Sequence, residues 1–201
     1  EKQFERLEVG EMAALRAKDL ATQLLTFAKG GAPVRQTASL TELIRDSTSF
    51  ALRGSNVRCE FQAPPDLWPV EVDQGQFSQV VQNLVINAVQ AMPNGGVVRV
   101  SADNVTLEAD SPLGLAPGRY CRITVKDHGI GIKPEHLGKV FDPYFTTKEK
   151  GTGLGLATSY SIVKKHDGIM TVDSTLGVGS EFHVYLPASE KEVVKEKTAT
   201  G

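Results

Sequence analysis

The chain has 201 residues, of which 40% are hydrophobic, 23% charged and 6% aromatic, an ordinary composition for a folded protein. Its 22 basic and 24 acidic residues give a formal net charge of −2, so charge gives no reason to expect nucleic acid or an anionic membrane as a partner. No apolar run approaches the roughly 18 residues that span a bilayer, and no signal peptide opens the chain. We therefore expect a cytoplasmic location without direct membrane contact, although a longer parent protein could carry a membrane anchor.

The first predicted element is a helix over residues 2–29. Its apolar residues recur in alternating steps of four and three, at Ala13, Ala17, Leu20, Leu24 and Phe27. A seam this narrow suits pairing with another helix. Two interpretations stay open: an ordinary amphipathic helix that lies on its own domain, or half of a helical hairpin.

From Thr37 onward, helical and strand-like stretches alternate. The pattern predicts three helices, over 40–53 (with Ser39 as its cap), 74–92 and 153–166. It predicts strands over 57–62, 69–72, 97–106, 120–126, 169–174 and 180–186. Residues 127–152 are predicted to form a long loop, and residues 188–201 a disordered tail. This order differs from a repeating βαβ series and predicts a mixed sheet with helices.

Two cysteines, Cys59 and Cys121, lie in the strand-like stretches. They are far apart in the sequence and match no metal-binding or redox spacing. We interpret them as buried free thiols in a reducing compartment.

The predicted helix over 74–92 has an unusual polar face. On a helical wheel, five carboxamide residues share one side: Gln76, Gln79, Asn83, Asn87 and Gln90. The opposite side is apolar and carries Phe77, Val81, Leu84, Ala88 and Met92. A solvated helix face normally contains Lys or Glu, and this stripe contains neither. Carboxamides suit a Mg²⁺ ion that keeps most of its waters and is shared with phosphates.

An aspartate with nearby glycines follows the predicted strand 120–126, as Asp127-His128-Gly129-Ile130-Gly131-Ile132. Glycines here allow a ligand to approach the backbone closely. An aspartate accepts hydrogen bonds without donating them, so it suits an exocyclic amine such as that of adenine. Acidic turns after strands are common, so this motif alone is weak evidence.

A second glycine-rich stretch, Gly151-Thr152-Gly153-Leu154-Gly155-Leu156, opens the helix over 153–166. Backbone N–H groups at a helix N-terminus form a phosphate site. The P-loop and Rossmann fingerprints both fail here, because the required Lys-Ser/Thr and third glycine are missing.

The loop between these motifs contains several lysines, among them Lys133, Lys148 and Lys150. Surface lysines usually only aid solubility, and we interpret Lys133 and Lys150 in this way. Lys148 follows the aromatic run 141–147, which suggests a lid that packs down when phosphate binds. A loop pinned to the core by Phe141 and Phe145 is compatible with the same pattern.

Taken together, residues 34–187 resemble the catalytic domain of histidine kinases in the gyrase, heat-shock-protein-90, kinase and MutL ATPase superfamily. Five segments resemble the family's boxes in the family's order: 79–88 the N box, 127–131 the G1 box, 141–148 the F box, 151–156 the G2 box and 177–180 a terminal glycine box. Residues 19–27 resemble the second helix of the family's dimerisation and phosphoacceptor domain.

The resemblance implies an α/β fold, a two-layer sandwich of the Bergerat type with helices on one face of a mixed sheet, preceded by one long helix. It implies ATP and Mg²⁺ as cofactors, with Asn87 as the metal ligand and Asn83 assisting. Asp127 would bind the adenine amine, and Lys148 would hold phosphate together with backbone 151–155. The implied ATP-binding set is Asn83, Asn87, Asp127, Gly129, Gly131, Ile132, Lys148, Gly151, Thr152, Gly153, Leu154, Gly155 and Leu156, of which Asn83, Asn87 and Lys148 are the catalytic candidates.

The residue at position 83 bears on whether the domain hydrolyses ATP or transfers its phosphoryl group. ATP-hydrolysing members of the superfamily carry a glutamate four residues before the metal asparagine, and this chain has Asn83 there. An asparagine cannot take a proton from water, so phosphoryl transfer is favoured over efficient hydrolysis.

The phosphoacceptor is expected outside this chain. None of the four histidines lies on an amphipathic helix upstream of the catalytic domain, and we interpret them as structural or surface residues: His128, His136, His166 and His183. The domains expected are a remnant of the acceptor helix at 1–31, the catalytic domain at 34–187 and the tail at 188–201.

The resemblance implies transfer from ATP to a histidine of a phosphoacceptor domain in the same or a sister protomer, and then to the receiver domain of a response regulator, in a homodimeric parent. Two alternatives stay open. One is a nucleotide-dependent interaction module without kinase activity, and the other is a gyrase-like ATPase.

Overall fold

The computed structural model describes residues 32–148 and 151–191. The predicted helix over 2–29 lies outside them. The described elements, in chain order, are β1 (Gln36–Ala38), α2 (Leu40–Ala51), β2 (Val57–Gln62), β3 (Val70–Val72), α3 (Gln74–Ala91), β4 (Gly96–Leu107), β5 (Gly118–Lys126), α4 (Pro134–Leu137), α5 (Gly155–Lys165), β6 (Ile169–Thr175) and β7 (Gly179–Pro187). Within these ranges, no helix has both the length and the apolar character that a membrane crossing requires.

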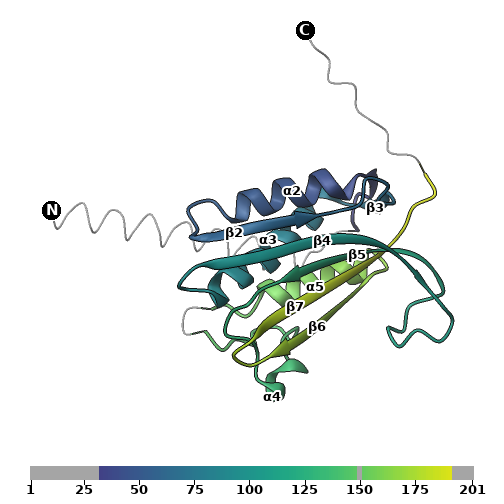
Figure 1. Cartoon of the computed structure of the whole chain (residues 1–201). Coiled ribbons are helices and arrows are strands. Elements are labelled where there is room, and N and C mark those ends of the chain that lie inside the picture. Colours follow the sequence, from purple (N-terminus) through teal and green to yellow (C-terminus); the bar gives the residue numbers. More distant parts are fainter. Residues whose placement is uncertain (1–31, 149–150, 192–201) are drawn as a thin grey trace, which may run out of the picture.

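The strands form a mixed five-stranded sheet in the order β2-β4-β5-β7-β6. β2 runs parallel to β4, and the other neighbours are antiparallel. A small second sheet pairs β1 with β3. Helices α2, α3 and α5 cover one face of the large sheet (Figure 1). The expected α/β fold with helices on one face of a mixed sheet is thereby confirmed.

The core lies between α3 and the sheet because both carry an apolar face at the right period. The predicted apolar side of α3 is buried throughout, from Phe77 to Met92. From the sheet, β4 contributes Val98, Val100 and Ala102 to the same cluster.

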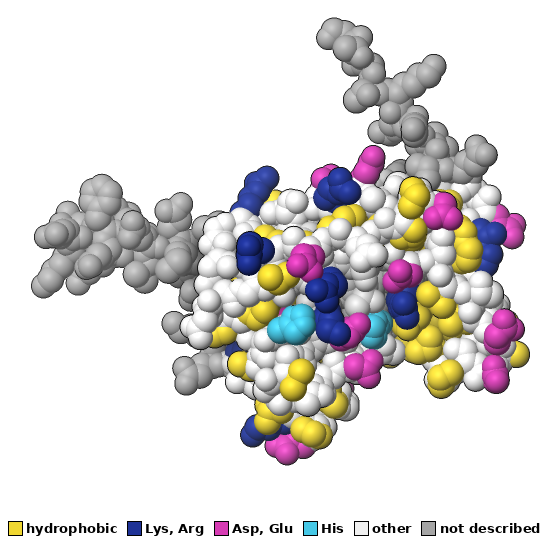
Figure 2. Space-filling view, in the orientation of Figure 1, with side chains coloured by type: hydrophobic (Ala, Val, Ile, Leu, Met, Phe, Trp, Pro, Cys, Tyr) yellow, Lys and Arg dark blue, Asp and Glu magenta, His cyan; other side chains and the backbone are white. Residues whose placement is uncertain are grey.

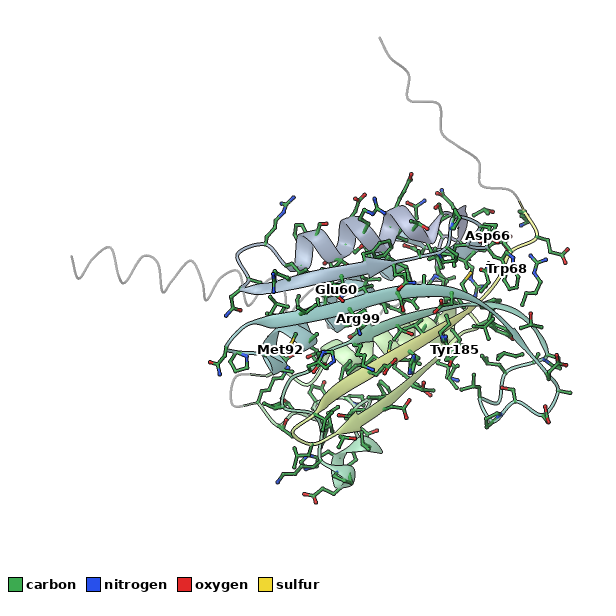
Figure 3. The ribbon with its side chains drawn as sticks, viewed as in Figure 1. Glu60, Asp66, Trp68, Met92, Arg99 and Tyr185 are labelled. Carbon is green, nitrogen blue, oxygen red and sulfur yellow. The ribbon has the colours of Figure 1, made fainter. Side chains whose placement is uncertain are left out.

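The opposite sheet face carries charges of both signs (Figure 2) and, where the loop between β4 and β5 covers it, a small hydrophobic cluster of Leu107, Tyr120 and Tyr185. Neighbouring strands are joined there by ion pairs. Glu60 on β2 meets Arg99 on β4 at 2.9 Å (Figure 3), and Lys126 on β5 meets Glu181 on β7 at 2.9 Å. Such exposed pairs add about 0–1 kcal/mol each, so they contribute little to the stability of the sheet.

Most predicted elements are confirmed within a few residues, and four features differ. β1 was not predicted, and α4 is a four-residue helix inside the predicted loop 127–152. Ser39 occupies the N-cap position of α2, but its side chain makes no cap hydrogen bond. At the other end of the chain, Ala188 bridges to Val70 and the Ser189 N–H donates to the Pro69 carbonyl at 2.7 Å. Ala188 and Ser189, which the tail was predicted to include, therefore still pair with the start of β3.

Both cysteines are free, but only Cys121 is buried. Burial raises the pKa of the Cys121 thiol to about 12. Cys59 is half-buried because β2 is an edge strand of the sheet, so the prediction that both thiols are buried is wrong for Cys59.

A buried histidine ties α5 to the start of α3. His166 is 2% exposed, and its Nε2 accepts from the Asp73 N–H at 3.0 Å. Its Nδ1 lies 2.8 Å from the Ile162 carbonyl, so Nδ1 carries the proton and Nε2 is free to accept. Asp73 in turn caps α3 by accepting from the Gln76 N–H. Two contacts thus hold the N-terminus of α3: the cap by the Asp73 side chain, and the bond from the Asp73 N–H to His166 at the end of α5.

Candidate functional site

A cleft of about 660 Å³ opens beside α3. This size lies in the range of small-molecule sites. Eleven of the thirteen residues predicted to bind ATP line it: Asn83, Asn87, Asp127, Gly131, Ile132, Lys148, Gly151, Thr152, Gly153, Gly155 and Leu156. The sequence motifs predicted to form an ATP site, although far apart in the sequence, therefore lie together around one cleft.

The other two predicted residues do not line the cleft. Leu154 is 1% exposed and belongs to the buried interior. Gly129 lies against the end of α3, where a Cβ atom would overlap the carbonyl of Ala91. The neighbouring Ile130 N–H donates to that same carbonyl at 3.1 Å. Gly129 thus permits the segment after β5 to pack closely on α3.

Only part of the carboxamide stripe faces the cleft. Asn83, Asn87 and Gln90 line it, whereas Gln76 and Gln79 lie earlier on α3, outside its lining. The Asn83 Nδ2 donates to the Gly155 carbonyl at 3.0 Å and to Ser159 Oγ at 3.1 Å. These bonds attach α3 to the first turn of α5 and leave the Asn83 Oδ1 for a ligand.

Lys148 reaches across the cleft to α3. Its Nζ donates to the Asn87 Oδ1 at 2.9 Å and to the Gln90 Oε1 at 2.5 Å. Partial burial lowers the pKa of Lys148, and the negative charge of Asp127 opposes that shift. Asn87 and Gln90 on α3 therefore bind a cation, the Lys148 ammonium, through their carboxamide oxygens.

Asp127 follows β5 and is 4% exposed. Its Oδ1 accepts from the Gly129 N–H at 2.8 Å and from the Ser180 N–H at 3.3 Å. Burial raises the pKa of Asp127, whereas these two N–H groups lower it and favour the carboxylate. No hydrogen bond within the described ranges uses the Oδ2 atom, which leaves it as an acceptor for the cleft.

The N-terminus of α5 opens at the cleft. Leu154 at its N-cap supplies no side-chain hydrogen bond, in contrast to Asp73 on α3. The first N–H groups of α5 therefore keep their partial positive charge available for an anion. Gly153 takes a φ of 67°, and a Cβ atom there would overlap the Tyr144 backbone. Glycine is required at this turn into the helix.

Sequence reasoning missed several lining residues. Ser180 orients Asp127 from 53 residues away, and no local signal reveals that contact. His136 and Phe145 form an edge-to-face ring pair at 5.3 Å, which the aromatic run alone did not predict. Gln90 was seen in the carboxamide stripe but was not assigned to the site.

The comparisons with known proteins agree with this geometry. Residues 72–190 match the family described as histidine kinase-, DNA gyrase B-, and HSP90-like ATPase, and the match includes α3, Asp127 and the glycine-rich start of α5. The chain belongs to this ATPase family. Membership in this family implies that the domain binds ATP.

Relatives of the chain include sensor kinases. The chain is 37% identical over 193 residues to the sensor kinase CckA of Brucella abortus, covering 92% of this chain and 20% of that protein. It is 34% identical over 191 residues to the sensor histidine kinase ZraS of Escherichia coli K12, covering 90% of this chain and 38% of that protein. The chain therefore spans well under half the length of these relatives.

The fold is also found among solved structures. A mycobacterial sensor histidine kinase, MprB, superimposes with a TM-score of 0.64 at 29% identity, covering 77% of this chain and 98% of that one. The ATPase-family domain described here is thus the catalytic, ATP-binding type that sensor histidine kinases carry.

Proposed function

We propose that this domain transfers the γ-phosphoryl group of ATP to a histidine on a phosphoacceptor domain outside this chain, for relay to a response-regulator aspartate. The observation that carries the proposal is the convergence of Asp127, the α3 carboxamides, Lys148 and the α5 N-terminus in one cleft. The cleft then offers one ligand three contacts: a hydrogen-bond acceptor for an amine, a site for a cation and a site for an anion. A nucleoside triphosphate bound with a metal ion requires all three.

The residues present fit a Mg²⁺ ion. Among the described residues no cluster of His, Cys, Asp or Glu could hold a metal, so a cation here depends on carboxamide oxygens. The Lys148 ammonium on Asn87 and Gln90 is a stand-in for such a cation. We propose Asn87 as the metal ligand, with Asn83 in support. When bound, Mg²⁺ supplies charge neutralisation at the phosphates.

Asn83 favours transfer over hydrolysis. Its Nδ2 is used by Gly155 and Ser159, and its Oδ1 has no proton affinity near neutral pH. Asn83 therefore positions the phosphate-binding turn and does not activate water. This supports an acceptor nucleophile that arrives from another domain.

None of the described histidines is placed as the acceptor. His166 is buried, and His183 is held by Thr124 on the sheet face at 3.0 Å. His136 packs on Phe145, and His128 follows Asp127 in the turn after β5. We propose that the acceptor lies on a phosphoacceptor domain of the same or a sister protomer in a homodimeric, cytoplasmic kinase, with a receiver domain as the next partner.

The test is phosphotransfer from γ-labelled ATP to a separately supplied phosphoacceptor domain. The native domain should label its histidine, and Asn87→Ala should reduce labelling by at least about a hundredfold, because a metal-positioning contact is lost. Gln79→Ala, on the same helix outside the cleft, is the matched control and should label normally. ATP binding without any labelling would contradict transfer and favour an interaction module, and steady phosphate release would indicate a hydrolase.

A further inference from the structure

Lys148 and the proposed metal compete for one atom. The Lys148 Nζ donates to the Asn87 Oδ1 at 2.9 Å, and that oxygen is the proposed Mg²⁺ ligand. An ammonium and a divalent cation on the same oxygen repel each other at short range. The described contact and a metal-bound Asn87 are therefore mutually exclusive arrangements of the site.

Gln90 is the second acceptor of that ammonium, at 2.5 Å. It lies three residues after Asn87 on α3, which places both carboxamides on one helix face. Gln90 is exposed, so it has no part in the core. The shorter of the two bonds to Lys148 is therefore made by a residue with no packing role and no assigned part in holding the metal.

The backbone of Lys148 is fixed separately from its ammonium. Its N–H donates to the Thr146 Oγ1 at 3.1 Å, and its carbonyl accepts from the Gly151 N–H at 3.1 Å. The long side chain can thus leave Asn87 by rotation about its own bonds while these two backbone hydrogen bonds are kept. From there it remains within the same cleft as the α5 N-terminus.

We propose that Gln90 is a positioning residue that holds Lys148 on Asn87 as an internal competitor of the metal. This inference rests on the proposed function. Binding of Mg²⁺ and nucleotide then requires Lys148 to give up Asn87, and Gln90 sets how much affinity that displacement costs. The apparent affinity is the intrinsic affinity multiplied by the fraction of molecules in which Lys148 leaves Asn87 open.

The test is calorimetric titration of the whole chain with ATP at several Mg²⁺ concentrations. Gln90→Ala removes the acceptor and keeps a good helix former on an exposed face. We expect it to bind ATP with Mg²⁺ about three- to tenfold more tightly than the native chain, and to need less Mg²⁺ for half-maximal binding. Gln79→Ala is the matched control and should match the native chain in both respects.

A combined variant isolates the contact. In a Lys148→Met background no ammonium competes, so adding Gln90→Ala should leave ATP affinity unchanged. Weaker binding by Gln90→Ala would mean that Gln90 contacts nucleotide or metal directly, and unchanged binding would mean that the contact has no energetic weight. Either result overturns the inference while the proposed function stands. Failure of the folded native chain to bind ATP would overturn both.

Discussion

Asp127 divides its two carboxylate oxygens between the protein and the cleft. The Gly129 and Ser180 N–H groups hold its Oδ1, which fixes the side chain in one orientation. An acceptor held in place before the ligand arrives loses little conformational freedom on binding. Asparagine at this position keeps the oxygen that the protein uses and replaces the other with a donor. Substitution by Asn therefore tests ligand recognition with little effect on the fold.

A second residue-scale feature is the buried, neutral His166. Burial lowers its pKa below the ordinary value of about 6.5, with Arg35 acting in the same direction and Asp73 and Asp167 opposing it. The unfolded chain therefore binds a proton at a higher pH than the folded chain does. The resulting stability is fully present above the unfolded-state pKa, and it is lost as pH falls from about 7 toward the lowered folded-state pKa.

We predict that His166→Gln flattens this pH dependence. Gln does not titrate, but it loses the bond to the Ile162 carbonyl and should destabilise the chain at pH 7.5 by about 1–2 kcal/mol. Urea denaturation at pH 7.5, 6.5 and 5.5 measures both effects. His183, whose pKa is also lowered by burial, remains in the variant, so part of the native slope should persist. Equal slopes for the native and variant chains would contradict the assignment.

At the scale of elements, the cleft depends on how closely the segment after β5 approaches α3. Gly129 lies against the Ala91 carbonyl at the end of α3, and Ile130 donates to that carbonyl. The same segment carries Asp127, so its position sets the position of the acceptor. Backbone atoms cannot move aside as a flexible side chain can.

We predict that Gly129→Ala destabilises the chain by about 1–3 kcal/mol and weakens ATP binding, because a Cβ atom separates this segment from α3. The matched control is Gly138→Ala after α4, where φ is −70° and no atom lies within 4 Å of the added Cβ. That control should stay within about 0.5 kcal/mol of the native chain. Urea midpoints give the stabilities, and a Gly129→Ala chain as stable as Gly138→Ala would refute the packing argument.

For the whole molecule, the sequence predicted those features that rest on periodicity or on local chemistry. The two faces of α3 follow from a period of 3.6 residues, and the glycine-rich start of α5 follows from the backbone N–H groups that a phosphate site needs. α4 has four residues, about one turn, which is too few for a helical period to be recognised, and β1 (Gln-Thr-Ala) lacks the apolar–polar alternation that the equally short β3 (Val-Glu-Val) shows. The contacts from Ser180 to Asp127 and from Lys148 to Gln90 join distant segments, and no single-sequence pattern reveals them.

Every role proposed for the site requires that the cleft binds ATP through Asp127. The direct measurement is calorimetric titration of ATP with Mg²⁺ into the native chain and into Asp127→Asn, with GTP as the control ligand. We predict roughly micromolar ATP binding by the native chain, no comparable GTP binding, and a loss of about ten- to a hundredfold in Asp127→Asn, the value of a charged hydrogen bond. A folded native chain that binds no ATP, or binds GTP equally well, would contradict the account.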